Sequence, residues 1–130
     1  MRLILVDDNP NFREAIKNYI EMELNHTVIA EVSSGKEFLG LTVIRMAHVI
    51  LMDIRMADMS GIETAKIAIE QHYPLRIVAL TNDAQNARLQ QLIEVGFKGF
   101  INKNEVFNCL EETLQLVSAG KFVFPKNLML

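Results

Sequence analysis

The sequence predicts an α/β fold built on a doubly wound parallel sheet, and three observations support that prediction. Apolar runs of four to six residues alternate with segments of helical periodicity along the whole chain. These runs are nearly continuous stretches of Val, Ile and Leu, which is typical of strands buried on both faces. Four of the runs lead into polar or charged residues, namely Asp7-Asp8, Asp53, Thr81 and Lys103.

The first half of the chain is expected to hold three strands and two helices. Residues 2–6 are a short apolar run and predict a buried strand. Pro10 suits the first turn of the helix that follows, whose apolar face repeats at three-four spacing through Phe12, Ala15, Ile16, Tyr19, Ile20 and Leu24. A strand at 27–32, a short helix over about 36–45 and a strand at 48–52 complete this half.

The second half repeats the alternation twice. Apolar residues at helical spacing predict a helix that begins just after Gly61 and ends before Pro74. Arg76–Leu80 forms the fourth strand, and a helix marked by Leu89, Leu92 and Ile93 stops at Gly96. Gly99–Asn102 forms the fifth strand. The last helix is marked by Val106, Phe107, Leu110, Leu114 and Val117 and ends at Gly120.

Five strands that alternate with five helices require parallel pairing through right-handed crossovers. Because the strands are apolar throughout, helices are expected on both faces of the sheet. The predicted fold is therefore a flavodoxin-like (βα)5 three-layer sandwich with strand order 2-1-3-4-5.

Length and composition narrow the function classes. The chain has 130 residues, enough for one domain with a sizeable core. The net charge of −3 and the lack of a basic cluster in the sequence argue against direct binding to nucleic acid. The single cysteine, Cys109, cannot form an internal disulfide and fits a cytoplasmic location, which we expect for this chain.

The charged residues at the strand ends predict a site. Asp7, Asp8 and Asp53 are expected at the carboxyl ends of adjacent strands, where open parallel sheets bind ligands. Three carboxylates that close together need a cation or raised pKa values, and oxygen ligands suit Mg²⁺, or Mn²⁺. With the amine of Lys103 and the hydroxyl of Thr81, the pocket would complement a phosphoryl group, and a carboxylate facing it could be the nucleophile.

At these positions the sequence resembles the receiver domain of two-component response regulators over roughly residues 1–119. The matching segments are Leu5-Val6-Asp7-Asp8-Asn9, Met52 through Gly61, Thr81, and Gly99-Phe100-Ile101-Asn102-Lys103. The likeness is greatest to the NarL/FixJ group, whose members carry a LuxR-type helix-turn-helix.

The resemblance implies a role for each matching residue. Asp53 would accept a phosphoryl group from a histidine kinase or phosphotransfer domain, and Lys103 would pair with the phosphoryl oxygens. Mg²⁺ would be bound by Asp8, Asp53 and the backbone carbonyl of Arg55, with Asp7 bound mainly through water. Thr81 would turn inward to the new phosphate, and the switch aromatic Phe100 would swing inward with it.

The sequence departs from the family pattern near this site. Ala57 and Asn104 stand where prolines are usual, and Asn82 replaces a small residue after the switch threonine. Arg55 and Asp83 each lie two residues past a site residue. Our hypothesis is that they pair across the pocket mouth and slow hydrolysis of the acyl phosphate.

Simpler interpretations stay open for the same residues. Asp7-Asp8 and Thr81 could be helix caps, Lys103 a solvated lysine, and Arg55 a surface charge. A phosphorylation-independent interaction module with a receiver fold is the alternative function. An aspartate-nucleophile phosphohydrolase is a more distant one, because Asp53-Ile54-Arg55 lacks that class's second acid.

The C-terminal segment also carries an expectation. Residues 120–130 resemble the start of a linker from a receiver domain to a LuxR-type DNA-binding domain. We therefore expect a receiver domain at 1–119, an output domain beyond this chain, contact with nucleic acid only through that domain, and a homodimer formed on phosphorylation.

Overall fold

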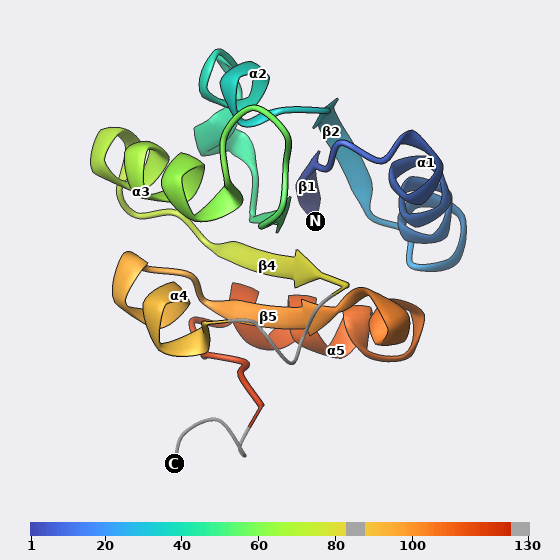
Figure 1. Cartoon of the computed structure of the whole chain (residues 1–130). Coiled ribbons are helices and arrows are strands. Elements are labelled where there is room, and N and C mark those ends of the chain that lie inside the picture. The colour runs from blue at the N-terminus through green and yellow to red at the C-terminus, as the bar shows by residue number, and fades with distance from the viewer. Residues whose placement is uncertain (83–87, 126–130) are drawn as a thin grey trace.

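The fold is a five-stranded, all-parallel sheet with strand order β2-β1-β3-β4-β5 (Figure 1), as predicted. The computed structural model describes residues 1–82 and 88–125. The strands are β1 (Arg2–Val6), β2 (Thr27–Val32), β3 (Val49–Asp53), β4 (Ile77–Thr81) and β5 (Gly99–Asn102). Strand β1 pairs with both β2 and β3, so the chain order reverses beside β1 and β3.

Helices cover both faces of this sheet. They are α1 (Pro10–Asn18), α2 (Gly35–Leu39), α3 (Gly61–His72), α4 (Leu89–Val95) and α5 (Val106–Ser118). Residues of α1 and α5 join one apolar cluster, and residues of α2, α3 and α4 join the other. Successive strand residues alternate between the clusters: Leu3, Leu5, Leu51 and Leu80 face α1 and α5, whereas Ile4, Val6, Met52 and Ala79 face the other layer.

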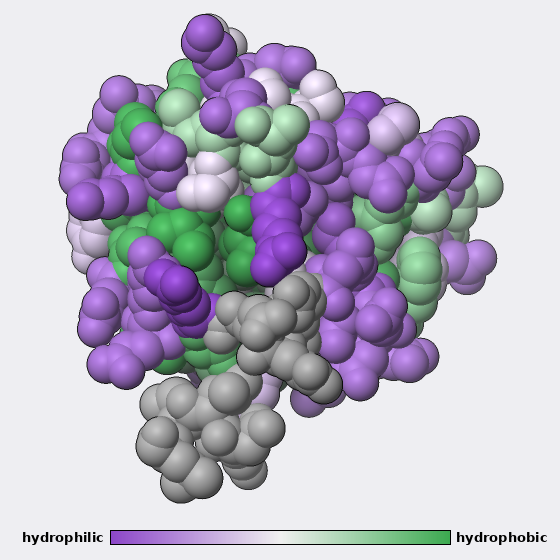
Figure 2. All heavy atoms as spheres, in the orientation of Figure 1, coloured by the Kyte–Doolittle hydropathy of each residue, from purple (hydrophilic) through white to green (hydrophobic). Residues whose placement is uncertain are grey.

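Hydrophobic surface also remains on one side of the molecule. Figure 2 shows that, in a mainly hydrophilic face, apolar side chains gather between α3 and α4. Ile62 and Ile69 of α3 and Val95 of α4 are partly buried and pack against the core.

Gly96 ends α4 with φ +120°, a backbone conformation that residues other than glycine rarely adopt.

One helix prediction was wrong in its extent, and another helix changes its winding along its length. The second helix, expected over about 36–45, ends at Leu39, and a separate 3₁₀ turn covers Ile44–Met46. Gly40 is a poor helix former, and the break lets the fully buried Ile44 reach the core from its own turn. The first helix is α-helical only to Asn18 and continues as a π-helical turn over Tyr19–Glu23.

The segment after α5 packs back onto the sheet. Val123 forms a parallel bridge to Gly99; its amide donates to Lys98 O at 2.9 Å, and its carbonyl accepts from Phe100 N at 3.0 Å. Ordered packing thus continues past residue 119. In the described parts of the chain, every helix is too short or too polar to cross a bilayer.

Candidate phosphoryl-transfer site

Three carboxylates meet at the carboxyl end of the sheet. Asp7 and Asp8 follow β1 directly, and Asp53 is the last residue of β3, its neighbour in the sheet. Among the described residues, these are the acids that bring one ligand atom each within 4.8 Å of one another. Asp7 and Asp53 are buried, whereas Asp8 is exposed. The sequence prediction that parallel pairing gathers these three acids is therefore confirmed as geometry.

Lys103 supplies the countercharge to this cluster. Its ammonium Nζ lies 2.6 Å from Asp7 Oδ2 and 3.2 Å from Asp53 Oδ2. The lysine follows β5 directly and is buried. The interpretation of Lys103 as a solvated surface lysine is wrong.

The cluster remains short of positive charge. One ammonium faces three carboxylates, and a deficit of this kind at close range is costly unless a cation or proton compensates it. Asp7 Oδ1 accepts from the Asn9 amide at 2.8 Å. Asp7 Oδ2 is buried and is paired with the Lys103 ammonium, and no other donor among the described residues is hydrogen-bonded to it. A set of oxygen donors with one ammonium for three carboxylates fits a hard divalent cation such as Mg²⁺.

The pKa of Asp53 reflects the same conflict of charges. Burial raises the pKa of this carboxyl above its usual value. The amide of Arg55, which donates to Asp53 Oδ1 at 3.0 Å, lowers the pKa; the charge of Asp7 raises it, and Lys103 lowers it. The net direction is upward, so the site as described is unfavourable for the charged form of Asp53.

The loop after β3 is held close to the nucleophile candidate. Ser60 caps α3 by accepting from the Glu63 amide at 3.1 Å. A Cβ on Gly61 would stand 2.2 Å from the carbonyl oxygen of Asp53 and 2.7 Å from Ile54 Cα. Only glycine lets the helix start so near the strand end.

The remaining predicted site residues lie around this centre. Thr81 ends β4 and is buried, beside Asn102 of β5 in the strand register. Phe100 on β5 is also buried and belongs to the cluster on the α4 side. Arg55 and Asn82 are exposed, each just beyond its strand end. Asp83 lies outside the described residues, so the pairing of Arg55 with Asp83 stays a prediction.

The family assignment follows from comparison with known proteins. The family model for the response regulator receiver domain matches residues 3–115. The chain belongs to this family. The receiver domain is 32% identical, over its full length, to a nitrate/nitrite response regulator protein homolog of Haemophilus influenzae, of which it covers 64%. It is 30% identical to the transcriptional regulatory protein YdfI of Bacillus subtilis, with 98% of this chain and 60% of the relative covered.

Solved structures agree with the fold. A LuxR-family response regulator from Aurantimonas superimposes with a TM-score of 0.88 at 24% identity, covering 98% of this chain and 91% of that one. The non-phosphorylated receiver domain of RcsB from Escherichia coli gives 0.81 at 26% identity, with 97% and 98% covered. The chain spans 54% to 64% of the length of the curated relatives it matches most significantly.

Two residues of the receiver domain's site were missed by the sequence analysis. The Phe12 ring lies under the Lys103 ammonium, 4.5 Å from Nζ to the ring centroid. Arg13 donates to the carbonyl oxygen of Asp7 at 2.6 Å and pairs with Glu31 on β2 at 3.2 Å. In the sequence, Phe12 fits only the pattern of a helix residue that faces the core. Arg13, the next residue, belongs to no pattern that would point to the site.

Proposed function

We propose that this receiver domain accepts a phosphoryl group on Asp53 from a histidine kinase or phosphotransfer domain, in a reaction that requires Mg²⁺ or Mn²⁺. The observation that supports it best is the buried contact of one lysine with two aspartates, beside a third, exposed aspartate. The same proposal places the domain in the cytoplasm with its kinase.

The proposed reaction exchanges one phosphoryl bond for another. A carboxylate oxygen of Asp53 forms a bond to phosphorus while the P–N bond of the donor phosphohistidine breaks, and the electron pair returns to the imidazole nitrogen. Lys103, which already contacts Asp53, would then pair with an oxygen of the bound phosphoryl group. The ammonium is in place before the reaction, so little reorganisation is needed.

The metal would be held by groups that the site already gathers. We assign its direct ligands to Asp8, Asp53 and the backbone carbonyl of Arg55, with Asp7 bound mainly through water. When bound, the ion would neutralise charge on the transferring phosphoryl oxygens. Asp7 Oδ2 is buried and contacts the Lys103 ammonium, which supports a role for that residue in ordering the water.

We propose Thr81 and Phe100 as the switch. Both are buried: Thr81 ends β4, and Phe100 lies beside Ala79 in the strand register and belongs to the core cluster. In this proposal the structure holds the inward orientation of the ring, and the phosphate would stabilise that orientation through Thr81. The readout would pass to a DNA-binding output domain and to a homodimer, with residues 120–130 as the beginning of the linker.

The decisive experiment is incubation with acetyl phosphate and Mg²⁺, followed by intact-protein mass spectrometry. We expect one added phosphoryl group in the parent chain and none in Asp53→Asn. Asp58→Asn is the matched control, because Asp58 is an exposed aspartate of the same loop, and it should be phosphorylated like the parent. Labelling of Asp53→Asn, or of neither protein, would instead favour the phosphorylation-independent interaction module.

A further inference from the structure

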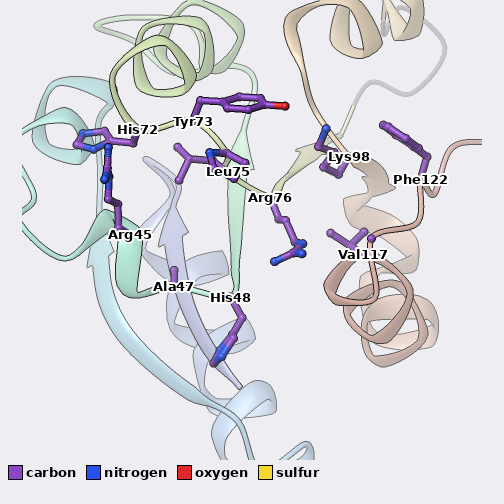
Figure 3. Close-up of a pocket in the computed structure, with 12 residues that line it drawn as sticks. Arg45, Ala47, His48, His72, Tyr73, Leu75, Arg76, Lys98, Val117 and Phe122 are labelled. Carbon is purple, nitrogen blue, oxygen red and sulfur yellow. The ribbon is translucent and has the colours of Figure 1, made fainter.

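A second pocket lies at the opposite, amino end of the sheet. It has a volume of about 390 Å³ and is lined by residues from several elements, ten of which Figure 3 labels. This volume falls in the lower part of the range of small-molecule pockets, roughly 300–1,000 Å³. The phosphoryl-transfer site is formed at the carboxyl ends of the same strands, so the two sites lie at opposite ends of the sheet.

The strand ladder brings the basic lining residues together. His48, Arg76 and Lys98 each precede a strand, namely β3, β4 and β5. Hydrogen bonds of 2.8 Å fix each of them to its neighbour strand: His48 N donates to Arg2 O, Arg76 O accepts from Ile50 N, and Lys98 N donates to Ile77 O. Because β3, β4 and β5 are adjacent, these three residues stand at one end of the sheet and line the same pocket.

The charge in this pocket is of one sign. Arg45 and His72 add two more basic side chains, and no carboxylate belongs to the described lining. Arg76 and Lys98 have no ion-pair partner in residues 1–82 and 88–125. Burial and the positive charges of Arg2, the N-terminus and Arg76 lower the pKa of His48. A cleft with one sign of charge and apolar walls concentrates the field and attracts an anion.

The pocket also offers apolar and aromatic surface. Ala47, Leu75 and Val117 contribute apolar side chains to its lining, and in Figure 3 the guanidinium of Arg76 points into the space between His48 and Val117. Tyr73 is 74% exposed and Phe122 is 62% exposed, so both rings have free surface. The bridge of Val123 to Gly99 sets the position of Phe122, whose ring centroid lies 4.9 Å from Lys98 Nζ.

We infer that this pocket binds a mononucleotide-like ligand, with a planar aromatic ring against Tyr73 or Phe122 and phosphate on Arg76 and Lys98. Arg76 can donate two parallel hydrogen bonds to phosphate oxygens, and Lys98 is a second positive charge in the same lining. The apolar lining and exposed rings would add nothing to the binding of an inorganic anion. A ligand that joins a ring to a phosphate uses both parts of the pocket. This inference does not depend on the proposed phosphorylation of Asp53.

The test is a titration of the ¹⁵N-labelled chain followed by NMR, in EDTA so that the acidic site carries no metal. The probes are ADP, pyrophosphate and adenosine. We expect saturable binding of ADP, with the largest amide shifts at Lys98, Gly99 and Phe122, and binding at least about tenfold weaker for pyrophosphate and for adenosine. Pyrophosphate binding as tight as that of ADP would overturn the aromatic subsite, and shifts centred on Asp53 would overturn the location.

Paired variants separate this pocket from general electrostatics. R76Q/K98Q removes the two proposed phosphate ligands and should weaken ADP at least tenfold. K36Q/K66Q removes the same net charge from exposed positions outside the pocket and should bind like the parent. Tyr73→Ala and Phe122→Ala, combined, should weaken ADP and leave pyrophosphate unchanged. Equal losses in the two charge variants would contradict the proposal, and circular dichroism checks that each variant is folded.

Discussion

Removing the Lys103 ammonium should strongly destabilise the domain in the absence of metal. Lys103→Met keeps most of the buried stem and deletes the charge that faces Asp7 at 2.6 Å and Asp53 at 3.2 Å. At an effective dielectric constant of about 20, these attractions are about 6 and about 5 kcal/mol before desolvation is subtracted. The Asp7–Asp53 repulsion, at an oxygen separation of up to 4.8 Å, is about 3.5 kcal/mol and would be left uncompensated.

The net cost is smaller than these gross terms, because desolvation of the lysine is recovered in the variant. Breaking a buried pair by deleting one partner typically costs about 3–5 kcal/mol. We expect a loss of about 3 kcal/mol in the free energy of unfolding, measured by urea titration in EDTA at neutral pH. In a domain of this size the thermal midpoint should fall by roughly 10 °C.

The pH dependence and two controls distinguish this electrostatic cause from lost packing. Lys103 lowers the pKa of Asp53, so its removal raises that pKa further and the folded state binds its proton more tightly. The deficit should therefore shrink as the pH falls through the folded-state pKa of Asp53. Lys66→Met, at an exposed position, should change stability by less than about 0.5 kcal/mol. Asp53→Asn placed in the Lys103→Met background should recover about 2 kcal/mol. A loss below about 1 kcal/mol, or one that is equal at every pH, would refute the reasoning.

Three further predictions follow from the same site. Asp53→Asn alone should raise the thermal midpoint in EDTA at neutral pH. Burial raises the folded-state pKa of Asp53, so the stability of the parent falls as the pH rises through that pKa. The gain in the variant should therefore vanish below that pKa, which melting curves across a pH series would show. Gly61→Ala should cost more than about 2 kcal/mol in urea titrations, because its Cβ would stand 2.2 Å from Asp53 O; a loss no greater than that of Gly40→Ala would contradict this. Phe12→Leu should cost about 1 kcal/mol beyond packing through loss of the ring below Lys103, and this excess should disappear when Phe12→Leu is made in Lys103→Met.

The strands and the acid cluster could be predicted because the sequence marks the strand ends and the charged residues together. Each apolar run ends where its strand leaves the core, and a charged residue follows it directly at 7 and 53 and after Asn102 at 103. Once the strands pair in parallel, these positions must share one edge. The prediction depended on where the strands end. The change from apolar to charged residues marks these ends clearly in the sequence.

The sequence marks the ends of the helices less clearly. The π-helical turn at Tyr19–Glu23 and the early end of α2 at Leu39 depend on how Ile20 and Ile44 reach the core. Both segments contain apolar residues at spacings that a continuous helix would also satisfy. Tertiary packing, which the local pattern does not encode, decides between the two arrangements.

The basic pocket could not be predicted from the sequence, for a different reason. His48, Arg76 and Lys98 are single basic residues separated by more than twenty positions, so no window of the sequence contains a motif. Each precedes a strand, whereas the residues of the predicted site lie at the carboxyl ends of strands. The residues that begin strands on adjacent positions of a parallel sheet are as reliably gathered as those that end them.

The balance of charge at the acidic site explains how one covalent change could alter the whole edge of the sheet. Lys103 is shared between Asp7 and Asp53, so any group that draws the ammonium toward residue 53 weakens its contact with Asp7. Asp7 Oδ2, which has no hydrogen bond among the described residues, would then need another partner. Arg13 ties the Asp7 carbonyl to Glu31 on β2, and Phe12 of the same helix lies against Lys103. A shift of Lys103 would thus change contacts of β1, β3, β5 and α1 together, because each of these elements positions a group in contact with Lys103 or with Asp7 or Asp53.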